Sequence, residues 1–475
     1  MTGIYLSCAF LISGLLFFNR NRVLKNLLII AFVLLQIGFT IYEYLHINTI
    51  ELTYFTADSL GVLLLITLCI ISIPAFYHSY VYLGTKQDNP KHTAIYFAAM
   101  IALLTSISAA YLSNHIAVTW IFVELTTLSA SALIYHRRNN RSLEGTWKYV
   151  FVCAISITLV FIGILFLSFS LPKAGTDDLS FSTLLNKARE LNAFWLRLAF
   201  IFIFTGFTAK LGLVPMYTAG IDAKDKAPSP AGALLSSVLM NVGFVGIFRS
   251  YMVTVNSSIH QWASHVIIIA ALLSIFVATV YMTKVKNIKR MFAYSSIEHA
   301  GIIMLGLAAG GVGNYAAILH IVLHSFIKSS LFFQQGQIYR IYQSKSIYDA
   351  GNYFKYNVTG SIVMLLGFFF ATAMPPSGLF ISEFMIFRSL FESNYLWILI
   401  VVMFLLTIII WAFGKNIFKL LFTPAVDFKE EGLKKINPFE SLSQFILLGL
   451  VVYLGLIPPQ QFVTLIQEAI KNIPH

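Results

Sequence analysis

Long apolar runs, separated by short polar segments, make up most of this chain. We count about 14 such runs, each near the roughly 20 residues that a helix needs to cross a bilayer. The runs are continuous, whereas the strands of a membrane β-barrel show short segments of alternating polarity. The pattern therefore predicts an all-α membrane protein with about 14 transmembrane helices.

Two of these runs are interrupted near their middle. One breaks at 212–215, just after Lys210, and the other at 374–378, just before Glu383. Helices broken within the membrane often build ion sites in transporters. The breaks sit at similar places in two five-span groups, 93–252 and 261–418, which predicts two transmembrane repeats.

The rest of the chain divides around these two groups. Residues 1–92 hold N-terminal transmembrane helices, and residues 419–475 hold a loop and the last helix. The two longest loops, 172–193 and 419–440, are too short to form a soluble domain.

Composition and charge agree with this picture. Only 11% of the residues are charged, against about 25% in soluble proteins, and 58% are hydrophobic. The net charge of +12 comes from lysines and arginines in alternate loops, which is typical of membrane topology rather than of nucleic-acid binding. The basic loops should face the cytoplasm, so we expect both termini outside a bacterial inner membrane.

Glu124 and Lys210 each lie within an apolar run. An ionisable side chain inside a membrane is costly and usually marks an ion pathway. We expect the two residues to form a pair whose charge can be switched by a nearby proton. The alternative for Glu124 is a protonated acid that bonds to a neighbouring helix.

His320, His324 and Lys328 are spaced by four residues in one apolar run. They share one helix face and span about 12 Å, which favours a proton relay. Zinc also binds histidines at this spacing, but no cysteine or second histidine motif completes a site. The three cysteines lie in separate runs without metal spacing. We therefore expect no metal and no cofactor.

Glu298 and His299 come shortly after Ser295, near the expected start of a helix. Ser295 and Glu298 fit a capping box, while the two titratable side chains also fit proton uptake near the inner surface. The sequence leaves both interpretations open.

Asn241 is a polar residue in another apolar run. It can hydrogen-bond between helices but cannot carry a proton. Charged residues also cluster before Pro228, where we expect a solvated loop: Asp222, Lys224, Asp225 and Lys226.

Three stretches resemble the antiporter-like subunits of respiratory complex I and their relatives in membrane-bound hydrogenases and sodium/proton antiporters. The stretches are 120–127, 293–299 and 324–332. The resemblance is greatest to the hydrogenase-4 component F branch, through residues 147–149, 295–299 and 374–380. It implies a proton-translocating subunit of an energy-converting oxidoreductase complex, with the redox centres in partner subunits.

The same resemblance implies roles for individual residues. Glu124 would pair with Lys210, His324 and Lys328 would continue a hydrated axis, and Glu383 would serve as the outer proton exit. Complex I relatives usually carry a lysine where Asn241 stands, so proton coupling at that point is in question.

The implied partners are other membrane subunits, the lipid bilayer and H⁺ or Na⁺, with no nucleic acid. No redox-centre motif occurs in the sequence, so any enzyme activity would belong to the whole complex. Two alternatives stay open: an Mrp-like Na⁺/H⁺ antiporter subunit, and a membrane scaffold that does not pump.

Overall fold

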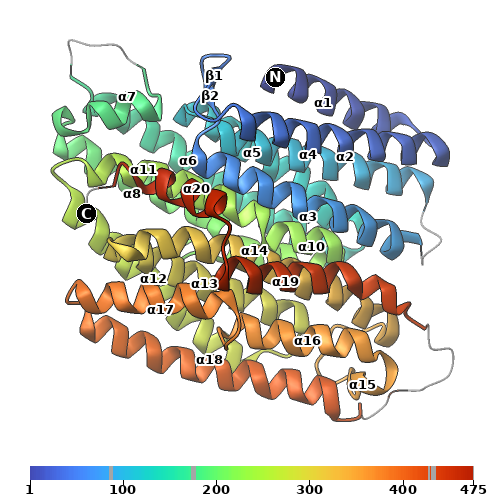
Figure 1. The fold of residues 1–475 in the computed structure, drawn as a ribbon. Coiled ribbons are helices and arrows are strands. Elements are labelled where there is room, and N and C mark those ends of the chain that lie inside the picture. The colour runs from blue at the N-terminus through green and yellow to red at the C-terminus, as the bar shows by residue number, and fades with distance from the viewer. Residues whose placement is uncertain (85–88, 173–177, 426–427, 429–434, 474–475) are drawn as a thin grey trace.

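A computed structural model describes the chain except for residues 85–88, 173–177, 426–427, 429–434 and 474–475. The described residues form a bundle of helices that run nearly parallel to one another (Figure 1). Among the described residues, twelve helices are long and apolar enough to cross a membrane, and two further apolar helices are shorter. The predicted all-α membrane fold is therefore confirmed.

The elements follow one another along the chain in this order. They are α1 (Thr2–Phe18), α2 (Arg22–Leu45), β1 (Ile50–Glu51), β2 (Phe55–Thr56), α3 (Ser59–Gly84), α4 (Pro90–Leu112), α5 (Ile116–Ile134), η1 (Tyr135–Arg137), α6 (Asn140–Ser170), α7 (Phe181–Asn186), η2 (Ala188–Glu190), α8 (Ala193–Leu211), α9 (Thr218–Lys226), α10 (Ser229–Ser236), α11 (Val238–Val255), α12 (His260–Lys284), α13 (Ile288–Ala309), α14 (Val312–Tyr342), α15 (Tyr353–Tyr356), α16 (Val358–Ala371), α17 (Gly378–Glu392), α18 (Leu396–Phe422), η3 (Pro438–Ser441), α19 (Leu442–Leu456) and α20 (Gln460–Ile470).

Both predicted interruptions occur. Helix α8 ends at Leu211, where Gly212 takes a left-handed conformation with φ of 83°, and α9 begins at Thr218. Glycine adopts this conformation without the steric cost that a side chain would add. The second break separates α16, which ends at Ala371, from α17, which begins at Gly378. Each break leaves helix ends inside the bundle, where their polar groups can face an ion.

The element order is the same in the two groups of spans. Helices α4, α5, α6, α8–α9 and α10–α11 form the first group, and α12, α13, α14, α16–α17 and α18 form the second. In each group the fourth span is the broken one. The assignment of these groups as repeats stays a prediction that rests on this shared order.

One end of the bundle carries the β-hairpin, α7 and the described ends of the chain (Figure 1). The Met1 ammonium pairs with Glu51 of the hairpin at 2.7 Å, and Asn256 donates to the Asn472 carbonyl at 2.9 Å. Both chain ends therefore lie on the same side, as an even number of crossings requires. Helix α15 lies at the opposite end.

The helices differ strongly in how much of their surface the rest of the chain covers. The apolar parts of α10–α11, α13 and α14 are completely buried, whereas only a third of that of α18 is. The outer helices expose large apolar side chains such as Trp397 and Phe404. Three central spans are thus screened from lipid, and polar side chains on them must find partners within the protein.

Candidate functional site

Lys210 lies in the last turn of α8, immediately before the first break, and is buried. Its Nζ donates to Thr127 Oγ1 on α5 at 2.8 Å and to Tyr149 Oη on α6 at 3.0 Å. Three helices therefore fix the position of this ammonium group. Its two partners are neutral hydroxyls, so the positive charge is solvated but not cancelled.

Glu124 lies one helical turn before Thr127 on α5 and is within electrostatic range of Lys210. Glu124 Oε2 is buried without a hydrogen-bond partner in the described structure. Glu124 interacts electrostatically with Lys210, but the described structure shows no direct ion pair between them. The pair whose charge can be switched therefore stays a prediction.

The charged residues after the first break are not a solvated loop, as the sequence had led us to expect. They form α9, in which Lys224 and Asp225 are buried. The Asp225 carboxylate contacts Lys226 at 2.7 Å and Lys345 at 3.3 Å. Alternating charges directly after a broken span were the signal that could have revealed this half-helix.

A polar cavity of about 440 Å³ lies beside Asp225. Its lining includes Arg137, Arg141, Lys226 and Lys345. Lys345 lies in the loop after α14, where burial lowers its pKa to about 8 and Asp225 partly offsets this shift. The cavity is therefore strongly basic, with one buried acid at its inner wall.

Lys224 has no acidic ion-pair partner in the part of the chain that the structure describes. It lies within electrostatic range of His324 and Lys328 on α14. Sequence reasoning missed this residue as a member of the central site. It places a positive charge between the first break and the second group of spans.

Asn241 is fully buried on α11, and its Nδ2 donates to Ser325 Oγ on α14 at 3.0 Å. This bond joins the two groups of spans, and the predicted interhelical hydrogen bond is confirmed. Ser325 lies between His324 and Lys328 in the sequence, so Asn241 contacts the relay helix without adding a charge to it.

Lys328 is fully buried on α14. Its Nζ donates to Ser295 Oγ on α13 at 2.7 Å, and the Phe292 carbonyl lies 3.5 Å away. Glu298 follows Ser295 by one helical turn and interacts electrostatically with Lys328. This second lysine is thus also solvated by a hydroxyl, with a glutamate nearby.

The capping interpretation of Glu298 is wrong. Helix α13 begins at Ile288, with Asn287 as its N-cap, so Ser295 and Glu298 lie in the helix interior. Glu298 and His299 are also both buried, and their role in proton uptake stays a prediction. The expected start of the helix was too late in the sequence. Lys289 and Arg290 lie in the first turn of the helix, and their charges do not fit the pattern of an apolar run.

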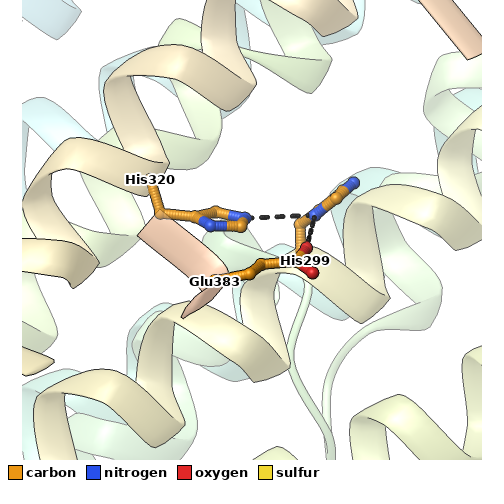
Figure 2. A group of neighbouring side chains, drawn as sticks. All are labelled: His299, His320 and Glu383. Atoms are coloured by element: carbon orange, nitrogen blue, oxygen red, sulfur yellow. Dashed lines mark hydrogen bonds and ion pairs between the residues drawn. The ribbon is translucent and has the colours of Figure 1, made fainter. Parts of the chain in front are cut away.

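Beyond Lys328, the side chains of His299, His320 and Glu383 converge from α13, α14 and α17 (Figure 2). His299 Nδ1 lies 3.1 Å from His320 Nε2 and 4.0 Å from Glu383 Oε1. His324 packs beside them, with its ring centroid 5.1 Å from that of His299. Both ring nitrogens of His324 lack a hydrogen-bond partner in the described structure.

The Ser382 hydroxyl lies 3.0 Å from both the Leu379 carbonyl and His320 Nδ1. When it donates to the carbonyl, it accepts the hydrogen of His320 Nδ1. In that tautomer His320 Nε2 presents a lone pair to a hydrogen on His299 Nδ1. A proton can therefore pass between the two rings.

A bundle with broken spans and a buried line of titratable side chains defines a multi-pass, antiporter-like membrane subunit. The chain belongs to the NADH:quinone oxidoreductase/Mrp antiporter transmembrane family, whose model matches residues 113–410. All of the candidate residues from Glu124 to Glu383 lie within that match. The predicted resemblance is confirmed.

Relatives and a solved structure agree with this membership. The hydrogenase-4 component F homolog of Methylacidiphilum infernorum is 30% identical over 72% of this chain and 74% of its own length. Subunit N of the NADH-quinone oxidoreductase of Halorhodospira halophila is 25% identical over 72% of this chain and 70% of its own length. In fold, the chain is similar to a subunit of an archaeal membrane-bound sulfane sulfur reductase, with a TM-score of 0.87, 18% identity and coverage of 99% and 97% of the two chains.

Proposed function

We propose that this chain moves protons through its buried charged residues, as a membrane subunit of an energy-converting oxidoreductase complex of the hydrogenase-4 or complex I type. One observation carries the proposal. Lys210 and Lys328 are both buried and bonded to neutral hydroxyls, with a glutamate one turn from the hydroxyl on α5 or α13. Among the described residues, neither ammonium is bonded directly to a carboxylate. Each lysine can therefore release its proton without leaving a buried carboxylate unpaired.

The path we infer begins at the basic cavity beside Asp225. We infer that protons reach Lys210 and Glu124 and then pass to the second group by way of Lys224, which interacts electrostatically with Lys328. The charge on each nearby glutamate sets how firmly its lysine holds a proton. Asn241 lies alongside this path and bonds to Ser325, so water rather than its side chain must carry protons past it.

The second half of the path runs from Lys328 through Glu298 to the histidines. His299 Nδ1 and His320 Nε2 lie 3.1 Å apart, and His324 lies beside His299. Glu383 is the last titratable group, and we infer that it releases the proton outward. Its side chain is 10% exposed, whereas that of His299 is fully buried.

The orientation follows from the charge of the two ends. The cavity with Arg137, Arg141, Lys226 and Lys345 lies at the end opposite the hairpin that binds Met1. Positive loops face the cytoplasm. We therefore place this cavity on the inner side of a bacterial inner membrane and both chain ends outside.

The names of the relatives support the proposed partners. A hydrogenase-4 component and an NADH-quinone oxidoreductase subunit both belong to multisubunit complexes by name. The experiment is to purify the complex through a tag on this chain and identify its subunits by mass spectrometry. We expect subunits with iron–sulfur or nickel–iron motifs. We also expect that the electron donor of these subunits drives proton uptake when it is added to sealed vesicles that contain the complex.

The family description also includes Mrp antiporters, so an Mrp-like subunit is the second candidate. The same vesicles separate the two functions. Our proposal predicts proton uptake that depends on the electron donor and persists without Na⁺. Uptake that needs Na⁺ and no redox reaction would support the antiporter, and an assembled complex without any ion movement would support a scaffold.

A further inference from the structure

The convergence of His299, His320 and Glu383 brings together the donor atoms of a transition-metal site. One ligand atom from each residue lies within 4.8 Å of the other two. In a tetrahedral zinc site with bonds of about 2.0 Å, ligand atoms are roughly 3.3 Å apart. The two imidazole nitrogens are already 3.1 Å apart, and Glu383 Oε1 is 4.0 Å from His299 Nδ1.

We propose that His299, His320 and Glu383 bind one divalent transition-metal ion of the zinc class. Two imidazoles and one carboxylate are a ligand set that zinc uses when its fourth position is left to water. Calcium and magnesium prefer oxygen ligands, so two nitrogens of three donors select against them. The widest ligand separation has to close by roughly 1.5 Å, which side-chain rotation can provide.

The surroundings of His320 prepare it as a ligand. Ser382 Oγ lies 3.0 Å from His320 Nδ1, and when it accepts the Nδ1 hydrogen the lone pair stays on Nε2. Bonds of this kind orient metal-binding histidines and fix their tautomer. Ser382 precedes Glu383 in α17, so one helix supplies both the carboxylate and the group that positions His320.

His299 has to change on binding. In the tautomer in which His299 Nδ1 carries the hydrogen directed at His320, a metal ion would displace that hydrogen. The opposite nitrogen, Nε2, is buried and can take it, since the Ala371 backbone lies within hydrogen-bond reach of the ring. A metal ion and a proton therefore compete for the same lone pairs, and affinity should fall as the pH is lowered.

The sequence did not indicate this site because the ligands lie on three helices. His320 and His324 alone lack the further ligands of a zinc site, and the fold supplies these from α13 and α17. Only Glu383 among the three has an exposed fraction, 10% of its side chain, so an ion reaches the site from that side.

Binding has a consequence for transport. A metal ion at His299 and His320 removes the hydrogen that passes between their rings, so an occupied site should block proton movement. This effect rests on the proposed function, whereas metal binding itself does not.

The test uses the full chain purified in detergent, stripped with a chelator and titrated with Zn²⁺ by calorimetry. One zinc per chain is expected, and His320→Gln and Glu383→Gln should each weaken binding at least tenfold. The control is His78→Gln, since His78 is a buried histidine on α3 that bonds to Ser443. Binding that is unchanged in both ligand variants, or absent from the wild type, would overturn the proposal.

A second measurement needs no variant and is independent of how well the variants fold. Zinc-edge X-ray absorption of the wild type should show two imidazole ligands with the remaining ligands oxygen. A sulfur ligand would assign the metal to a cysteine and contradict the site. Because neither measurement uses transport, zinc binding by a chain that moves no protons would leave the site in place and remove only the proposed function.

Discussion

The two groups of spans hold their buried lysines in the same way. In each, the ammonium donates to a hydroxyl on a neighbouring helix, and a glutamate lies one helical turn from that hydroxyl. The residues are Lys210, Thr127 and Glu124 in the first group, and Lys328, Ser295 and Glu298 in the second. Along the chain, the glutamate precedes the hydroxyl in the first group and follows it in the second, so the two arrangements share their chemistry but not their residue order.

The groups differ in what surrounds the lysine. Lys210 has a second hydroxyl partner, Tyr149, at 3.0 Å, whereas Lys328 has only the Phe292 carbonyl at 3.5 Å. The second group adds the converging histidines and Glu383, which have no counterpart among the residues around Lys210. We infer from this comparison that the first group holds a positive charge and that the second group passes protons on.

Removing the lysine of the second group should have the largest effect. In Lys328→Ala the path loses the residue that connects Lys224 and Glu298 to the histidines, so proton uptake by sealed vesicles should fall to background. Lys328→Arg keeps the charge but cannot release a proton, and it should fail as well. Normal uptake by the arginine variant would show that titration at this position is unnecessary.

Removing the hydroxyls should separate the two groups. Ser295→Ala leaves the Lys328 ammonium with only the distant Phe292 carbonyl, and an unsatisfied buried donor costs about 1–3 kcal/mol. Thr127→Val leaves Tyr149 in place, so its cost should be smaller. Thermal unfolding in detergent and vesicle uptake should both rank Ser295→Ala as the more damaging change. Equal effects would contradict the difference that we draw between the lysines.

A change at the contact between the groups should affect stability more than transport. Asn241→Ala removes the bond to Ser325, at a cost of about 1 kcal/mol. The carboxamide does not gain or lose a proton, so proton uptake per assembled complex should stay within about twofold of the wild type. Loss of uptake at normal assembly would place Asn241 in the path itself.

The smallest perturbation tests the two ends of the bundle. Arg138→Cys and Ser182→Cys, both at exposed positions, should leave transport unchanged. In a Cys8→Ser background, which removes the exposed native cysteine, a membrane-impermeant thiol reagent should label position 182 from outside and position 138 from inside. Labelling of position 138 from outside would reverse the orientation.

Sequence patterns predicted the features that follow from local order. Apolar runs gave the membrane helices, glycine and proline marked the breaks beside Lys210 and Glu383, and helical spacing placed His320, His324 and Lys328 on one buried face. Each of these depends on residues close together in the chain, where helix geometry is known in advance.

The errors concern contacts between helices. Spacing could not show that hydroxyls of α5 and α6 would bond to Lys210, or that Lys224 would be buried. Nor could it bring His299 and Glu383 to His320, since that depends on how α13, α14 and α17 pack. Partner choice in a membrane interior is decided by tertiary packing, which one chain's periodicity does not contain.

The most direct test of the proton path is Lys210→Ala, compared with Lys148→Ala in matched vesicle preparations. Lys148 is a surface lysine on α6 with 56% of its side chain exposed, so its loss removes the same charge outside the path. At equal assembly on native gels, we predict background proton uptake for Lys210→Ala and wild-type uptake for Lys148→Ala. Wild-type uptake by an assembled Lys210→Ala complex would contradict the account.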